Sequence, residues 1–301
     1  MKTLVTGALQ TTEEDLLALQ AAGLEITIHP DERTPVQAPE RYEAVICNGL
    51  FLYQNIELFH NLKYIQLTSA GYDRVPLDYI RQHGISLHNA AGVYSIPMAE
   101  WTILRILELY KHSACLHENQ QNRRWKKNRS WTELSGKTAC IIGYGAYGHE
   151  TAKRLKAFGV TVQVVNRTNK QSPFIDAVHP LTALPAVLPR ADIVILAIAL
   201  TPETQHLIGA KELAQLKPGA ILINAARGAL IDEVSLIHAL EHGPLLGAAL
   251  DVFEIEPLPE TSRLWDLPNV LLSPHNSFVG EQTHHRLMSI ILDHLAPELT
   301  T

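Results

Sequence analysis

The sequence is poor in the features that mark secreted, membrane-spanning and metal-binding proteins. Its three cysteines, Cys47, Cys115 and Cys140, lie far apart without CxxC spacing, which predicts reduced thiols rather than a disulfide framework. No HExxH motif or close His/Cys cluster occurs among the fifteen histidines, so no metal site is expected. No apolar run is long enough to cross a bilayer, and the opening MKTLVTG lacks the order of a signal peptide. We therefore expect a cytoplasmic protein.

The chain also lacks an excess of positive charge. Its formal net charge is −6, which argues against a nucleic-acid-binding surface. The one basic run, from Arg123 to Lys127 around Trp125, is short and indicates a solvated loop or an interface segment. Hydrophobic residues make up 46% of the 301 residues, enough to bury two cores, and two domains are favoured over one.

The first half of the chain alternates short apolar runs with helix-like segments, which is typical of a parallel β-sheet with helical crossovers. The apolar runs are KTLVTG, LEITIHP, AVICNG, YIQLTSAG and ISLHNA. From Ser95 to about Glu118 the periodicity predicts one long amphipathic helix, with Pro97 near its start where a missing amide is tolerated.

The second half predicts a separate α/β sheet. Its runs are almost continuously apolar, as expected when helices cover both faces. They are ACIIG, TVQVVN, ADIVILAIAL, GAILINAA, LLGAALDVF and NVLLSPH. The tail from Glu281 to Leu299 has helical periodicity and is expected to pack back on the first half.

A glycine-rich turn follows the first strand of this second sheet. Gly143, Gly145 and Gly148 form GxGxxG between the strand and a predicted helix, HETAKRLKAFG. The first glycine permits the tight turn, the second lets a pyrophosphate approach, and the third allows close packing of helix on strand. Free amides at the helix N-terminus would then face the phosphates. The pattern predicts a dinucleotide-binding unit.

The residues at the end of the next strand indicate which dinucleotide. An acidic residue there would hold the ribose of NAD, but the sequence has Asn166, Arg167 and Thr168, followed by Lys170. A guanidinium can pair with the 2′-phosphate of NADP through two hydrogen bonds, whereas a carboxylate would repel it. NADP is favoured, and NAD bound without the acidic contact stays open.

Three ionisable residues follow the carboxyl ends of predicted strands, where open α/β sheets bind ligands. Arg227 follows AILINAA, Glu256 comes shortly after GAALDVF, and His275 follows VLLSP. Each alone could be an ordinary surface or core residue. Together they supply an anion holder, a proton donor and a partner for that donor, which is the set that hydride transfer to a 2-oxo acid requires.

The sequence resembles the D-isomer-specific 2-hydroxyacid dehydrogenase family across most of its length. The matching motifs, in the family's order, are LTSAGYDRVPLDYI, NAAGVYSIPMAEW, ELSGKTACIIGYGAYGHETAKRLKAFG, LTPETQHLI, LINAARGALIDE, AALDVFEIEP and LLSPHNS. They are specific to the family but not to one substrate. The resemblance implies hydride transfer between a nicotinamide cofactor and C2 of a small 2-oxo acid.

The resemblance also implies residue roles. Arg227 would bind the substrate's carboxylate and 2-oxygen, His275 would act as the acid/base, and Glu256 would hydrogen-bond His275 and favour its imidazolium. The implied cofactor-binding residues are Gly143, Gly145, Ala146, Tyr147, Gly148, Asn166, Arg167, Thr168, Thr201 and, at the nicotinamide end, Asp251. The implied substrate-binding residues are Ala70 and Gly71, through their amides, and Leu50, Phe51 and Tyr94.

The family fold implies two doubly wound, Rossmann-like α/β domains with the active-site cleft between them. The substrate-binding domain would comprise residues 1–96 plus 276–301, and the dinucleotide-binding domain residues 97–275. A homodimer through the cofactor domain is expected.

The sequence leaves the substrate open. Asn276, Ser277 and Phe278 replace the small, glycine-rich stretch that commonly follows the histidine in the family. Phe278, together with Leu50, Phe51 and Tyr94, favours aliphatic or aromatic 2-oxo acids, while glyoxylate, hydroxypyruvate and 3-phosphoglycerate remain alternatives. A rival interpretation is a dinucleotide-binding sensor that resembles transcriptional corepressors related to this family.

Overall fold

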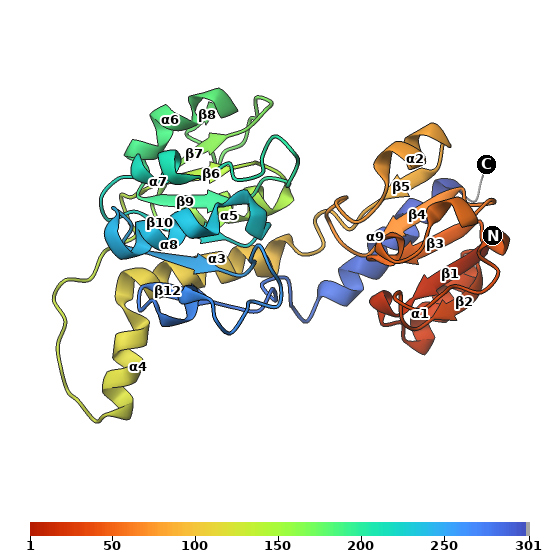
Figure 1. Ribbon diagram of the computed structural model, residues 1–301, viewed down its shortest axis with the longest axis horizontal. Helices are drawn as coiled ribbons and strands as arrows, with labels where there is room; N and C mark the ends of the chain where they lie inside the picture. Colours follow the sequence, from red (N-terminus) through yellow and green to blue (C-terminus); the bar gives the residue numbers. More distant parts are fainter. Residues whose placement is uncertain (299–301) are drawn as a thin grey trace. The chain divides into compact units, whose positions relative to one another are not determined.

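A computed structural model describes residues 1–298, which form two α/β units (Figure 1). Unit 1 comprises Met1–Tyr94 together with the chain from Gly280 onwards, and unit 2 comprises Ser95–Val279. The chain therefore leaves unit 1 and returns to it. Leu299, the last residue of the predicted tail helix, lies outside the described residues.

Unit 1 is a five-stranded parallel sheet in the order β2-β1-β3-β4-β5. Its strands are β1 Lys2–Thr6, β2 Glu25–His29, β3 Ala44–Cys47, β4 Tyr64–Leu67 and β5 Ser86–His88, and its helices are α1 Glu13–Ala21, α2 Leu77–Gln82 and α9 Thr283–Glu298. One sheet face packs against α1 and α9, through Leu19 and Ile291, and the other against α2, through Ile80. The tail thus packs on the first half, as predicted.

Unit 2 is a seven-stranded parallel sheet in the order β12-β11-β10-β9-β6-β7-β8. Its strands are β6 Thr138–Ile142, β7 Thr161–Val165, β8 Ala177–His179, β9 Ile193–Leu196, β10 Ile221–Asn224, β11 Gly247–Leu250 and β12 Val270–Leu272. Its helices are α3 Ser95–Lys111, α4 Ser113–Gln121, α5 Ala146–Ala157, α6 Leu184–Val187, α7 Ala210–Ala214 and α8 Glu233–His242. The six predicted strands are all present, and the half-buried edge strand β8 is an addition.

The nearly continuous apolar runs of unit 2 are explained by burial on both sides. Along β6, Ile141 packs in the same cluster as side chains of α3 and α5, whereas Cys140 and Ile142 pack with those of α6, α7 and α8. Successive residues of a strand point to opposite faces, so a strand covered on both sides has no polar position to spare. The predicted fold class, two doubly wound parallel α/β units, is confirmed.

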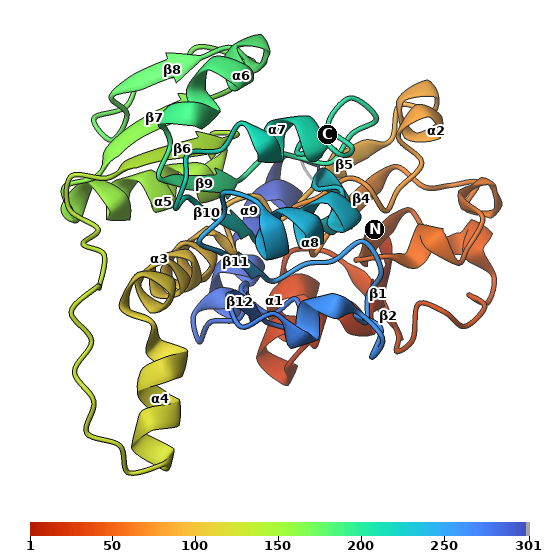
Figure 2. The same ribbon diagram turned by 60° about the vertical axis from the view of Figure 1, so that its left-hand side comes forward.

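The prediction of one long helix from Ser95 to about Glu118 is wrong in one respect. The helix breaks at His112, which adopts a left-handed conformation with φ of 50° between α3 and α4. None of the residues of α4 is buried, and it projects with the following loop away from the sheet of unit 2 (Figures 1 and 2). The apolar stripe that holds α3 on the sheet therefore does not continue into α4.

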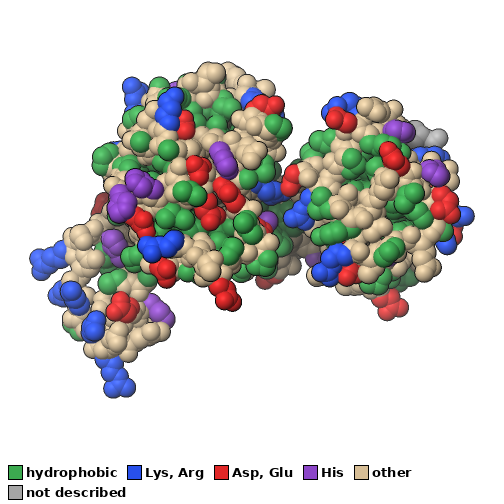
Figure 3. Space-filling model, in the orientation of Figure 1, with side chains coloured by type: hydrophobic (Ala, Val, Ile, Leu, Met, Phe, Trp, Pro, Cys, Tyr) green, Lys and Arg blue, Asp and Glu red, His purple; other side chains and the backbone are tan. Residues whose placement is uncertain are grey.

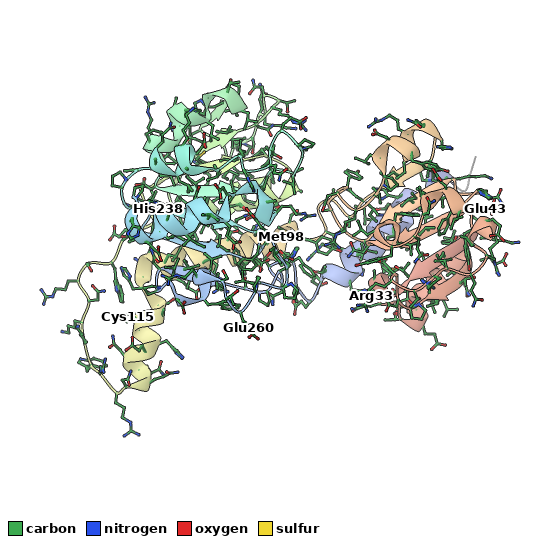
Figure 4. The ribbon with its side chains drawn as sticks, viewed as in Figure 1. Arg33, Glu43, Met98, Cys115, His238 and Glu260 are labelled. Atoms are coloured by element: carbon green, nitrogen blue, oxygen red, sulfur yellow. The ribbon has the colours of Figure 1, made fainter. Side chains whose placement is uncertain are left out.

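Membrane-spanning helices and clusters of metal-ligating side chains are both absent from residues 1–298. No helix there has the length and hydrophobicity required to cross a membrane. Nor do these residues contain a group of three or more His, Cys, Asp or Glu side chains placed to hold a metal ion. All three cysteines are free thiols; Cys47 and Cys140 are buried, and Cys115 is exposed on α4 (Figure 4).

Candidate active site

The glycine turn of unit 2 lies at the point where the strand order reverses. The chain runs outward from β6 to β7 and β8, then crosses back to β9 on the other side of β6. Gly143 follows β6 with φ of 94°, and a Cβ placed on it would lie 2.3 Å from the carbonyl oxygen of Ala197, just after β9. Only glycine can occupy that position, so the turn is held tightly against the switch point where such sheets bind ligands.

Gly145 and Gly148 differ in the space around their Cα atoms. A Cβ on Gly148 would lie 2.6 Å from the carbonyl oxygen of Gly143, so this glycine allows α5 to pack closely on the turn. A Cβ on Gly145 would meet nothing within 4 Å. The space above Gly145 is therefore open to a ligand at the N-terminus of α5, where the amides of Ala146 and Tyr147 lie in the first turn. The cradle fits a dinucleotide pyrophosphate.

The side chain of Tyr147 is directed into the protein. Its hydroxyl lies 2.7 Å from that of Thr102 on α3, and burial raises the pKa of the phenol. Tyr147 can therefore contribute to a cofactor site through its backbone, while its ring packs between α5 and α3.

The loop after β7 presents cations where an acidic residue would select NAD. Arg167, Thr168 and Lys170 are exposed. The carboxamide of Asn166 is already engaged: its Oδ1 accepts from the amide of Tyr144 at 3.3 Å, and its Nδ2 donates to the carbonyl oxygen of Thr168 at 2.9 Å. Asn166 thus stabilises the conformation of the loop, and the exposed cations beside it make the loop positively charged.

The loop after β9 carries Thr201. Its amide donates to the hydroxyl of Thr204 at 2.8 Å, and that hydroxyl donates to the carbonyl oxygen of Ala199 at 2.8 Å, so the turn is internally closed. A hydrogen bond from Thr201 lowers the pKa of Glu203, and the positive charge of Arg167 lowers it further. The two loops are therefore close enough to interact electrostatically.

His275 and Glu256 form a direct pair. Nδ1 of His275 lies 2.7 Å from Oε2 of Glu256, and the two side chains are 32% and 36% exposed. The other carboxylate oxygen, Oε1, accepts a hydrogen bond from the amide of Phe253 at 3.0 Å. The pair is thus fixed in orientation while remaining partly exposed, and the Nε2 atom of His275 takes no part in the contact with Glu256.

Asp251 organises the segment that carries His275. It is fully buried, and its carboxylate accepts from Ser273 Oγ at 2.6 Å and from the amides of Asn276 and Ser277 at 3.0 and 2.9 Å. His275 itself has φ of 50°, an uncommon conformation for a residue with a side chain. Three hydrogen bonds on both sides of that residue hold the backbone in this conformation. The role of Asp251 in holding this loop was not expected from the sequence.

Arg227 follows β10 at the same edge of the sheet. The Asn224 carboxamide holds this turn, because its Nδ2 donates to the carbonyl oxygen of Arg227 at 2.9 Å and its Oδ1 accepts from the amide of Ala226 at 3.1 Å. The next residue, Gly228, permits close approach to the segment that leads to Glu256, since a Cβ there would lie 1.9 Å from the carbonyl carbon of Phe253. The three ionisable residues therefore sit on mutually supporting loops of unit 2.

An apolar cavity of about 540 Å³ adjoins the His275 and Glu256 pair within unit 2. Besides the pair itself and Ser273 and Pro274, it is lined by Phe253, Pro257, Leu258, Trp265 and Leu272. A histidine and a carboxylate at the rim of an apolar cavity can meet a bound molecule whose remaining surface is apolar.

The predicted substrate-binding residues of unit 1 lie at the carboxyl edge of its own sheet. Phe51 follows β3 and packs edge-on against Phe59, while Leu50 is fully buried in the core. Ala70 and Gly71 follow β4, and the Tyr94 hydroxyl donates to the carbonyl oxygen of Thr68. Burial raises the pKa of Tyr94 to about 12, so it is a neutral donor at physiological pH.

Sequence reasoning missed Glu32, which ties together the loops at this edge. Its Oε1 accepts from the hydroxyl of Thr6 and the amide of Asn48, both at 2.7 Å, and its Oε2 accepts from the amide of Gly49 at 2.7 Å. The loop that carries Leu50 and Phe51 is thereby fixed to the end of β1. The only sequence signal was an acidic residue shortly after a strand, which is too common to be informative.

Comparison with known proteins identifies the family. The sequence model described as "D-isomer specific 2-hydroxyacid dehydrogenase, NAD binding domain" matches residues 103–277. The glyoxylate reductase of Thermococcus litoralis is 36% identical over 239 residues, covering 76% of this chain and 71% of that protein. The D-3-phosphoglycerate dehydrogenase of Bacillus subtilis is 38% identical over 218 residues, covering 71% of this chain but only 41% of that protein.

The fold comparison agrees with the sequence comparison. The crystal structure of an NADPH-dependent glyoxylate/hydroxypyruvate reductase from Sinorhizobium meliloti superimposes with a TM-score of 0.83 at 27% identity, covering 100% of this chain and 95% of that chain. Fold, glycine turn and family match point the same way. The chain belongs to the D-isomer specific 2-hydroxyacid dehydrogenase family, a family of NAD(P)-dependent oxidoreductases.

Proposed function

We propose that the protein reduces small 2-oxo acids to D-2-hydroxyacids, with NADPH as the favoured hydride donor. The observation that carries the proposal is the 2.7 Å contact between His275 Nδ1 and Glu256 Oε2, at the ends of neighbouring strands in a dinucleotide-binding unit. A histidine held by a carboxylate at one ring nitrogen is a general acid at the other.

The proton step follows from this geometry. His275 donates a proton from Nε2 to the 2-oxygen of the substrate as that oxygen gains charge, and takes it back in the reverse direction. Glu256 stabilises the positive imidazolium that precedes the transfer, and the amide of Phe253 keeps the carboxylate in place. When bound, a reduced nicotinamide supplies the hydride to C2. Arg227 holds the carboxylate of the substrate through charge-assisted hydrogen bonds.

The cofactor preference rests on the loop after β7. Arg167 and Lys170 are exposed there, and Asn166 replaces the acidic residue that would hold the ribose of NAD. A 2′-phosphate carries two negative charges or nearly so, and a guanidinium beside it forms short bidentate hydrogen bonds. The solved relative from Sinorhizobium meliloti is named NADPH-dependent, which supports the same preference.

The substrate side chain is proposed to be apolar. The cavity beside the His275 and Glu256 pair is lined largely by apolar and aromatic residues, and Phe278 lies 6.2 Å from the His275 ring in an edge-on arrangement. Both features favour aliphatic or aromatic 2-oxo acids, such as 2-ketoisocaproate or phenylpyruvate. Relatives named glyoxylate reductase keep glyoxylate and hydroxypyruvate as alternatives.

The test is oxidation of NADPH and of NADH by the purified protein with a panel of 2-oxo acids. The panel comprises pyruvate, glyoxylate, hydroxypyruvate, 2-ketoisocaproate, phenylpyruvate and phosphohydroxypyruvate. Rapid NADPH oxidation with one or two of them is expected. Cofactor binding without turnover on any member would refute the proposal and favour a dinucleotide sensor.

The acid/base assignment has its own test. His275→Ala should lower the rate of reduction by about 100-fold to 10,000-fold, the usual contribution of a general acid, while the dinucleotide still binds. The matched control is His238→Ala, which removes an exposed histidine on α8 (Figure 4). Near-normal turnover in the His275 variant would remove this residue from the mechanism.

We also propose that two copies of the chain associate through α4 and the loop from 122 to 131, here called the arm. Residues 122 to 131 are all exposed, Trp125 is 96% exposed, and residues 123–129 carry five positive charges in a chain of net charge −6 (Figure 3). A long segment with an uncovered tryptophan gains stability if another surface buries it. A second copy of this acidic chain is the proposed cover.

Light scattering coupled to size-exclusion chromatography tests this association. The parent protein should have the mass of a dimer at micromolar concentration, and Trp125→Ser should weaken the dimer. Trp265→Ser, which replaces a tryptophan that is 55% exposed elsewhere in unit 2, is the control. A monomeric parent protein would contradict the proposal.

A further inference from the structure

The loop from Asn166 to Ser172 carries the exposed cations Arg167 and Lys170 and contains no helix or strand. Such a loop would ordinarily have to become ordered when it grips a ligand, and that ordering lowers affinity. In this protein both ends of the loop are fastened to one residue of the glycine turn, Tyr144.

The first attachment is made by the backbone of Tyr144. Its amide donates to Oδ1 of Asn166 at 3.3 Å, at the start of the loop. The same Asn166 side chain donates onward to the carbonyl oxygen and the hydroxyl of Thr168, at 2.9 and 3.2 Å. The segment on either side of Arg167 is thereby closed into a turn.

The second attachment is made by the phenol of Tyr144. Its hydroxyl donates to Oγ of Ser172 at 2.9 Å, at the end of the loop, and Ser172 Oγ also accepts from the amide of Phe174 at 3.3 Å. Nδ1 of His149 lies 3.3 Å from the Tyr144 hydroxyl. With the phenol proton directed to Ser172, His149 can act as the donor in that second contact.

The surroundings leave the phenol little freedom. The Tyr144 residue is only 9% exposed, and its ring meets the edge of His149, which in turn meets the edge of Phe174. Because rotation of the ring would break the Ser172 contact and disturb this packing, the loop end has a defined position relative to the turn. Tyr144 stands between Gly143 and Gly145, so its hydrogen bonds attach the loop directly to the pyrophosphate cradle.

We propose that Tyr144 and Ser172 are positioning residues for cofactor selection, which hold Arg167 at the distance from the pyrophosphate cradle that a 2′-phosphate requires. The inference rests on the proposed NADPH preference and adds the reason for it in the fold. A loop that is ordered before binding should raise the affinity for NADPH, whose 2′-phosphate contacts the cations. It should change the affinity for NADH little, because NADH has no 2′-phosphate.

The test compares dissociation constants of NADPH and NADH, measured by titration of nicotinamide fluorescence. Tyr144→Phe removes one hydroxyl and keeps the ring packing, so the NADPH preference should fall by about 3-fold to 10-fold, the usual net effect of one hydrogen bond. Ser172→Ala should produce a similar fall. The fall in the double variant should be smaller than the sum of the two single effects, because both substitutions remove the bond between Tyr144 and Ser172.

Two reference variants make the outcomes distinguishable. Tyr110→Phe removes another buried hydroxyl of unit 2, which contacts the carbonyl oxygen of Asp192, and should leave the preference unchanged. Arg167→Ala should abolish most of the preference. If it does so while Tyr144→Phe and Ser172→Ala leave the preference intact, the positioning role is overturned and the 2′-phosphate site stands. If Arg167→Ala itself has no selective effect, the 2′-phosphate site is wrong, and this inference is wrong with it.

Discussion

Replacement of Asp251 by asparagine should destabilise unit 2 and displace His275 together. In the parent protein Oδ1 accepts from Ser273 Oγ and from the amide of Asn276, and Oδ2 accepts from the amide of Ser277. Asparagine keeps only one oxygen. Its NH₂ group must then face at least one of these donors in a fully buried site, where neither group can reach water.

The magnitude follows from the lost contacts. A hydrogen bond to a charged group contributes about 1.5 to 3 kcal/mol, and a buried donor left without an acceptor costs a comparable amount. With the other two contacts weakened by loss of charge, the free energy of unfolding should fall by about 2 to 4 kcal/mol. For a unit of this size that corresponds to a melting temperature lower by about 5 to 15 °C. Because the same contacts hold the backbone around His275, turnover should fall by about 10-fold or more in the folded variant.

The assay is thermal unfolding followed by circular dichroism, with turnover measured well below the transition. Ser273→Ala is the matched control, because it removes one donor and leaves the carboxylate with two, and it should cost about 1 kcal/mol. A melting temperature of Asp251→Asn within about 1 °C of the parent would refute the reasoning, since the site would then tolerate a buried clash of donors.

Four further substitutions test separate parts of the structure. Gly228→Ala should yield little folded protein, because its Cβ would overlap the backbone of Phe253. Gly145→Ala should keep the parent melting temperature but weaken dinucleotide binding, because its Cβ lies in open space at the cofactor cradle. Equal melting temperatures for the two variants would contradict this difference. Burial, and then the neighbouring His88, lowers the pKa of His294, although Asp293 opposes the shift. The pKa of His294 is therefore lower in the folded protein than its unfolded value of 6.5. The contribution of His294 to the free energy of unfolding is fully present above pH 6.5 and is lost as the pH falls through the folded pKa. Melting temperature should therefore decline between about pH 7 and pH 5, and His294→Gln should flatten that decline; an unchanged slope would show that other groups cause it. Glu32→Gln should raise the KM for the 2-oxo acid and leave the cofactor Kd constant, because the new NH₂ group faces an amide of the loop that carries Phe51. An unchanged KM would show that this loop does not contribute to substrate binding.

The architecture could be predicted from the sequence alone, because the signals that specify it are local. Strands buried on both sides need unbroken apolar runs, which made six strands of unit 2 readable without coordinates. The glycine turn was equally readable, since φ of 94° at Gly143 and the close approach at Gly148 leave no alternative residue. The family match likewise follows from motifs along the chain. The edge strand β8, with three half-buried residues, carried too little pattern to predict.

The pairing of the ionisable side chains could not be predicted from the sequence and became visible only in the folded units. Glu256 meets His275 across 19 residues, and Asp251 meets Ser277 across 26, because the loops after adjacent parallel strands are brought to one sheet edge in a fixed register. The bonds from Tyr144 to Ser172, across 28 residues, and from Glu32 to Asn48, across 16, depend on loop paths in the same way. Apolar periodicity specifies which face of an element is buried, but a hydrogen bond requires two atoms within about 3 Å, and that distance is set by the packing of the whole unit.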